Sequence, residues 1–91
     1  MSYKITPYTL KRAKELGVEV KPSKLKNKKI DIYKNGTKLA SVGDIRYNDF
    51  GTYLQMGNVS LANEKRSAYH KRHSKDNVKG TRGWWALNLL W

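Results

Sequence analysis

The sequence contains no cysteine. This absence excludes disulfide bonds and zinc sites built from cysteine thiolates, and a small chain that needs neither is typical of a reducing compartment. The sequence also lacks the run of about 20 apolar residues that a membrane-spanning helix needs, and its first residues lack the apolar core of a signal peptide. We therefore expect a soluble protein that is not secreted and does not bind a membrane.

Acidic residues are also scarce, since seven Asp and Glu face 19 Lys and Arg, which gives a formal net charge of +12. Seven scattered carboxylates and two histidines form no Ser-His-Asp set and no paired-carboxylate pattern, and there is no glycine-rich phosphate loop. We therefore expect no enzymatic activity and no cofactor. So large an excess of one charge destabilises the compact state unless an anion offsets it, so an anionic partner is the first expectation.

The 91 residues are enough for one small core. Thr6 is suited to cap a helix that starts at Pro7, and Gly17 is suited to end it in a left-handed conformation. These signals predict a helix over Pro7–Leu16. Because its apolar strip is narrow, we expect residues 1–20 to form a helical arm beside a single basic α+β domain over residues 21–91.

A β-hairpin is predicted in the first half of that domain. Lys29–Tyr33 and Thr37–Val42 flank Asn35-Gly36, and this dipeptide favours a tight hairpin turn because both of its positions need positive φ. Alternation within the strands predicts one buried face and one wet face, with the lysines pointing outward. The lysine-rich run that precedes the hairpin is expected to form a loop or an edge.

Two helices are expected next. A cap at Asn48–Asp49 predicts a short helix that ends near Met56. A second, strongly basic helix is expected to start at a Ser60 or Asn63 cap and to end near His73. On that helix we expect Ala68 and Tyr69 to face the core, while Lys65, Arg72 and His73 face outward.

The last predicted helix, Arg82–Trp91 with Thr81 as its cap, is apolar nearly all round and should be buried. We expect an α+β fold in which the hairpin and the basic helix pack around this helix. The predicted structural core is Tyr69, Trp84, Leu87 and Trp91, and the remaining space is filled by Tyr33, Tyr47 and Phe50. The tryptophans are expected to be core residues rather than platforms for base stacking.

Two basic clusters, Lys21–Lys38 and Lys65–Arg82, each hold seven Lys or Arg against a single acid. Together they favour contact with the phosphates of a nucleic acid, without sequence specificity. The residues expected to make these contacts are Lys24, Lys26, Lys28, Lys29, Lys65, Arg66, Lys71 and Arg72.

The two histidines leave an alternative open. His70 and His73, with Glu64 nearby, resemble part of a metal cluster, and the run from Tyr69 to His73 suggests a histidine-dependent nuclease. No third strong ligand follows at a suitable spacing, so we expect no metal site. Both histidines are then expected at a solvated or interface edge.

The order of features along the chain resembles a family of small basic proteins encoded by large DNA viruses and some phages. The residues that carry the resemblance are the lysine-rich run Ser23–Lys29, the hairpin, Gly43-Asp44 with Tyr47 and Asp49-Phe50, then Arg66, Tyr69, Arg72-His73, and Gly83-Trp84-Trp85 to Leu90-Trp91. The resemblance covers residues 22–91. It implies viral origin and a place in or near the virion, and it brings no catalytic residues.

Two functions are therefore expected. The first is a non-enzymatic minor virion component that contacts nucleic acid electrostatically, in the particle and in the cytoplasm or viral factory of the host cell. The alternative is a minor capsid or cement protein that binds other capsid proteins, with its last helix inserted into a neighbour. A second copy of the chain is a further candidate partner.

Overall fold

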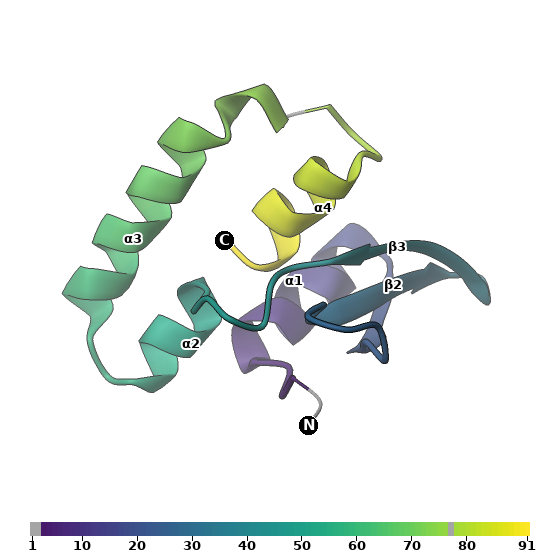
Figure 1. Ribbon diagram of the computed structural model, residues 1–91, viewed down its shortest axis with the longest axis horizontal. Coiled ribbons are helices and arrows are strands. Elements are labelled where there is room, and N and C mark those ends of the chain that lie inside the picture. The colour runs from purple at the N-terminus through teal and green to yellow at the C-terminus, as the bar shows by residue number, and fades with distance from the viewer. Residues whose placement is uncertain (1–2, 77) are drawn as a thin grey trace.

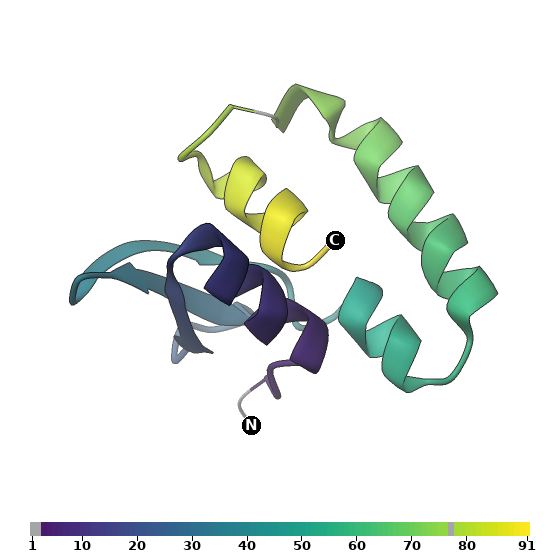
Figure 2. The ribbon, with the colours of Figure 1, turned by 180° about the vertical axis from the view of Figure 1, so that it is seen from behind.

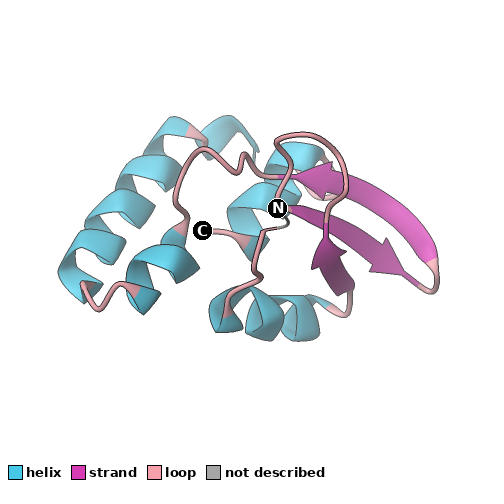
Figure 3. Cartoon of the chain, turned by 60° about the horizontal axis from the view of Figure 1, so that its bottom comes forward, coloured by secondary structure: helices cyan, strands magenta, loops and turns pink. Residues whose placement is uncertain are grey.

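The computed structural model, which describes residues 3–76 and 78–91, has an α+β fold. Its antiparallel sheet has the order β1 (Glu19–Pro22), β2 (Ile30–Lys34), β3 (Thr37–Val42). Asn35 and Gly36 join β2 to β3 with φ angles of 51° and 79°, as a two-residue hairpin turn requires. The predicted hairpin is therefore confirmed. Figure 3 shows the strands gathered at one side of the molecule.

Helix α1 (Pro7–Leu16) has the predicted ends. The Thr6 side chain accepts a hydrogen bond from the Thr9 N–H, and Gly17 follows the helix with φ of 72°. Pro7 at the first helical position has no N–H that would need a partner.

Helix α1 shares the core of the rest of the chain rather than extending from it. The Thr9 hydroxyl donates to the backbone oxygen of Leu89 over 2.8 Å, and Arg12 Nε donates to that of Asn88 over 2.9 Å. Ala13 and Val18 are buried in the main apolar cluster. Helix α1, which was expected to belong to an arm over residues 1–20, thus packs against α4 (Arg82–Leu89), as the view from behind shows (Figure 2).

The core lies between the sheet, α1 and the C-terminal segment. It consists of Ala13, Val18, Ile30, Ile32, Val42, Trp85, Leu89 and Leu90. Of the predicted core residues, Leu87 is buried, whereas Tyr69, Trp84 and Trp91 are only partly buried. Trp84 and Trp91 pack against the main apolar cluster, whereas Trp85, which the predicted core left out, is buried within it. The predicted helix end was wrong, since α4 stops at Leu89.

Helix α2 (Phe50–Gln55) is capped by Asp49, as predicted, and α3 runs over Val59–Arg72. The cap of α3 is Asn58, whose side chain accepts from the Leu61 N–H over 2.9 Å. The expected caps Ser60 and Asn63 instead lie within α3.

Helix α3 packs against α2 and the short 3-10 turn η1 (Ser74–Asp76), and Figure 1 shows it apart from α4. The expectation that it packs around the last helix, predicted over residues 82–91, holds only at the end of that stretch, where the Tyr69 ring stacks on Trp91. The reason is its surface, since Ala62 is the buried residue of α3 and a helix with so little apolar surface cannot bury a wide face.

The aromatic residues expected to fill the core divide into two groups. Phe50 is buried and Tyr33 is partly buried. Tyr47 is 68% exposed, so its assignment to the core was wrong. Among residues 3–76 and 78–91, no helix is long and apolar enough to cross a bilayer.

Candidate functional site

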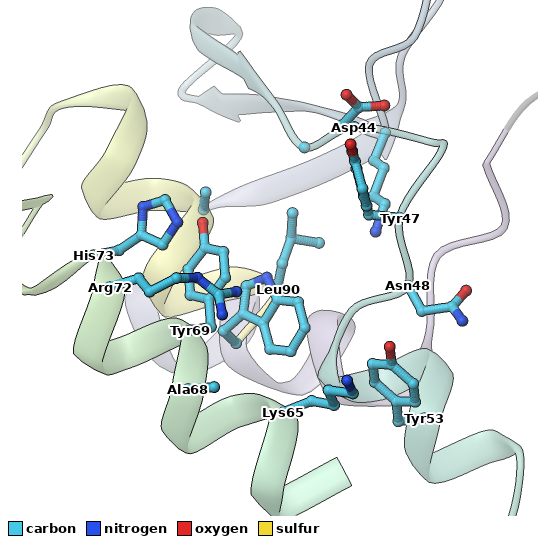
Figure 4. A pocket seen from close by; sticks show the side chains of 14 residues that line it. Asp44, Tyr47, Asn48, Tyr53, Lys65, Ala68, Tyr69, Arg72, His73 and Leu90 are labelled. Atoms are coloured by element: carbon cyan, nitrogen blue, oxygen red, sulfur yellow. The ribbon is translucent and has the colours of Figure 1, made fainter. Parts of the chain in front are cut away.

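A pocket of about 480 Å³ opens between α3, the segment 43–48 and the C-terminal residues. Ala86, Leu90 and Trp91 line its apolar side. Lys29, the residue before β2, also lines it. We call this the central pocket. Figure 4 shows Leu90 between two walls, with Tyr69 and Arg72 on one side and Tyr47 and Asn48 on the other.

The α3 wall of the central pocket is formed by Lys65, Ala68, Tyr69 and Arg72, followed by His73. Positions that are three, four and seven residues apart lie on one face of a helix. The expected division holds for four of these residues, since Ala68 and Tyr69 are partly buried, with Tyr69 stacked on Trp91, whereas Lys65 and Arg72 are exposed. The outward position expected for His73 was wrong, because its ring is partly buried and stacks on Tyr69. The aromatic ring and the cations share one wall.

An aromatic stack connects α3 to the C-terminal segment. The Tyr69 ring stacks on the rings of both Trp91 and His73. The distance between ring centres is 4.6 Å to Trp91 and 4.1 Å to His73. On a neighbouring side of α3, Arg66 Nε donates to the Trp91 backbone oxygen over 2.7 Å, and His70 Nε2 lies 3.1 Å from the same oxygen. Contacts with a single residue, Trp91, thus connect α3 to the end of the chain.

The opposite wall carries Asp44, Tyr47, Asn48 and Tyr53. Arg46 binds the Asp44 carboxylate through two nitrogens, with Nη2 at 2.7 Å and Nε at 3.0 Å. These hydrogen bonds lower the pKa of Asp44 to about 2. Because the Arg46 charge offsets that of Asp44, this acid does not cancel the positive charge of α3.

Lys29 is buried, with 3% of its surface exposed. Its Nζ lies 2.9 Å from Asp49 Oδ2, and the Tyr3 hydroxyl donates to the same carboxylate. The assignment of Lys29 to phosphate contact, and with it an outward position for every lysine of the hairpin, was wrong. A cation with an internal carboxylate partner is not available to a ligand.

A second, smaller opening of about 220 Å³ adjoins the central pocket and shares Gly43, Tyr69 and Ala86 with it. Lys28 and Arg82 are among its lining residues. We call it the side hollow. The two basic clusters of the sequence, which lie far apart along the chain, therefore meet at these adjoining openings.

The structure brings together only some of the predicted phosphate-binding residues. Lys65 and Arg72 line the central pocket, Lys28 lines the side hollow, Lys24, Lys26 and Lys71 are exposed outside both, and Lys29 and Arg66 have partners within the chain. The Arg66 guanidinium lies 5.0 Å from the centre of the Phe50 ring.

Sequence reasoning missed Arg82, Tyr47 and Tyr53 as lining residues. The position of Arg82 in the second basic cluster was a usable signal. Tyr47 and Tyr53 gave none, because they come from a loop and a short helix whose placement depends on tertiary packing. Within the described part of the chain, no three His, Asp or Glu side chains are grouped so that they could hold a metal ion.

The chain was also compared with known proteins. No protein-family model, curated protein or solved structure matches it.

Proposed function

We propose that the protein is a non-enzymatic nucleic-acid-binding protein that holds the phosphate backbone along the central pocket and the side hollow. One observation carries the proposal. Lys65 and Arg72 from the second basic cluster line the central pocket, and Lys28 from the first cluster and Arg82 from the second line the adjoining side hollow, which shares lining residues with it. Nothing in the local structure of either cluster requires this convergence, whereas a polyanion explains it.

The chemistry of the surface fits phosphate rather than a specific sequence. Lys65, Arg72 and Arg82 are exposed, so they are free to move onto a charged backbone. Neutralising phosphates releases counterions, which makes binding fall with salt by a log-log slope of about −0.9 per phosphate on duplex and about −0.7 on single strands. Contacts of this kind position a protein on nucleic acid without reading bases.

The test compares two double variants that remove the same charge. Lys65→Ala with Arg72→Ala alters the central pocket, whereas Lys11→Ala with Lys34→Ala removes two exposed lysines outside both openings. Affinity for random-sequence DNA is measured by fluorescence anisotropy from low to high salt.

The pocket variant should bind more weakly and lose about two units of salt slope, one for each phosphate contact removed. The control should keep most of the affinity and slope. Equal effects in the two variants would mean that net charge, not this surface, drives binding. Affinity that is absent or independent of salt in the unaltered protein would refute the proposal.

The resemblance to small basic proteins of large DNA viruses and phages supports a place in the virion, next to the packaged genome. Quantitative mass spectrometry of purified particles, before and after the genome is released, tests this placement. A protein that copurifies with the genome fits the proposal, whereas one that stays with empty shells fits the cement alternative. That alternative relied on the last helix inserting into a neighbour, but Trp85, Leu87 and Leu89 of α4 are buried within the chain itself.

A further inference from the structure

We infer that the central pocket receives an unpaired base, so that the protein prefers single-stranded to duplex nucleic acid. The inference rests on the proposed function and names its substrate class. It is carried by the combination of aromatic rings and cations in one pocket. Tyr47, Tyr53, Tyr69 and Trp91 line it together with Lys65 and Arg72.

The pocket has the size and the apolar side that a base needs. Its volume of about 480 Å³ lies within the range of roughly 300 to 1,000 Å³ that is typical of small-ligand sites. Leu90, Ala86 and Trp91 supply an apolar surface. In a duplex the faces of the bases are covered by their neighbours, whereas in a single strand they are open to stack on aromatic side chains.

Tyr47 is the most exposed large apolar or aromatic side chain among the described residues. It is 68% exposed, and its ring contact in the described part of the chain is with the Arg46 guanidinium, 6.0 Å from the ring centre. The stack of Tyr69 on Trp91 is accounted for by the attachment of α3 to the C-terminal segment, but no such role exists for Tyr47. A large exposed ring at the wall of a basic pocket is suited to stack on a base.

The cations are placed to hold the backbone on either side of that base. Lys65 and Arg72 lie seven positions apart in α3, which is about 10 Å along a helix. Tyr69 lies between them in the sequence. Phosphates that flank an inserted base therefore each meet a cation. Figure 4 shows Lys65, Tyr69 and Arg72 on α3, with the Arg72 side chain next to Tyr69, and Tyr47 on the other side of Leu90.

The test measures the affinity of the protein for three labelled probes by fluorescence anisotropy at one salt concentration. They are a labelled oligothymidylate, an abasic strand with the same number of phosphates, and a duplex of the same length. The unaltered protein should bind oligothymidylate about 5-fold or more tighter than the abasic strand, the gain that stacking of one base provides. Tyr47→Ala should remove this gain, so that oligothymidylate and the abasic strand bind with similar affinity, while Tyr47→Phe should retain it. Matching thermal melts would show that Tyr47→Ala stays folded, as its exposure indicates.

The outcomes separate this inference from the proposed function. If all three probes bind with similar affinity, the pocket takes no base and the inference fails, while electrostatic binding stands. If oligothymidylate is preferred but Tyr47→Ala keeps the preference, the bases are held elsewhere and the inference also fails. If no probe binds, the proposed function fails first and the inference with it.

Discussion

Replacing Lys29 with methionine tests whether this lysine stabilises the fold rather than binding a ligand. The substitution keeps a long unbranched side chain and removes the charge. Asp49 then stays buried, with 0% of its side chain exposed, and loses the ammonium 2.9 Å away. Its remaining hydrogen bonds come from the Tyr3 hydroxyl and the Thr52 N–H, so an uncompensated carboxylate is left inside the protein.

Breaking a buried ion pair in this way costs about 3 to 5 kcal/mol. A chain of 91 residues has a total free energy of unfolding of about 5 to 14 kcal/mol. The substitution should therefore remove a large share of the stability. The loss should exceed that of an exposed lysine, for which changes stay within about 0.5 kcal/mol.

The loss should also depend on pH. Burial by itself raises the pKa of Asp49, but the charge of Lys29 and the hydrogen bonds from Tyr3, Lys29 and Thr52 outweigh burial and lower it. In the unaltered protein this contribution is present above the unfolded pKa of about 3.9 and is lost as pH falls through the lower folded pKa. In Lys29→Met, the charge and hydrogen bond of Lys29 no longer oppose burial, so the folded pKa of Asp49 should rise above its value in the unaltered protein, and protonation of Asp49 should relieve the variant at a higher pH. The difference in free energy of unfolding between the unaltered protein and Lys29→Met should therefore become smaller as pH falls from neutral to about pH 4.

Urea unfolding followed by tryptophan fluorescence measures both effects, and Lys26→Met is the matched control. Lys26 comes from the same lysine-rich segment but is exposed, so its variant should unfold like the unaltered protein across the pH range. The reasoning would be wrong if Lys29→Met lost less than about 1 kcal/mol at neutral pH. It would also be wrong if the loss stayed constant down to about pH 4.

Two further substitutions test the packing of the core by urea unfolding. Gly51→Ala should lower the free energy of unfolding by about 1 to 3 kcal/mol or more. The reason is that a Cβ at this position would overlap the side chain of Thr6, which is 1% exposed and caps α1. An unchanged stability would mean that α1 and α2 do not pack this closely. Trp85→Ala should cost about 3 to 5 kcal/mol and Trp84→Ala clearly less, since Trp85 is buried and Trp84 partly buried; the reverse order would mean that Trp84 contributes more to the core than Trp85.

The predictions that held depend on local chemistry. Asn35-Gly36 forms its turn through two positive φ angles, and Thr6 and Gly17 bound α1 through groups within a few residues of each other. Such signals do not need the rest of the fold to be known. The α+β fold class followed from them.

The predictions that failed depend on contacts between distant residues. Nothing near Lys29 distinguishes it from the other lysines of its run, because its partner Asp49 lies twenty positions further along the chain. Trp85 was left out of the predicted core for a different reason. A helix that is apolar nearly all round has no one-sided pattern from which its buried face can be read.

For the same reason, only one wall of the candidate site could be predicted from the sequence. The spacing of Lys65, Tyr69 and Arg72 places them on one helical face, so the α3 wall of the central pocket follows from the sequence. The opposite wall does not, because Tyr47 belongs to a loop that is joined to a distant segment, with the Ile45 N–H donating to the backbone oxygen of Asn27.

The basic residues differ in their surroundings, and this difference explains how a chain with a formal charge of +12 can fold while some of its cations stay exposed. Lys29 is neutralised inside by Asp49, whereas Lys65 and Arg72 stay exposed on a helix that has little buried apolar surface of its own. Contacts with Trp91 connect α3 to the end of the chain. A polyanion lying in the central pocket would reduce the repulsion between α3 and the basic residues near the sheet, and would therefore stabilise the same arrangement that binds it. Under the proposed function, the binding of a polyanion and the placement of α3 would therefore be one equilibrium.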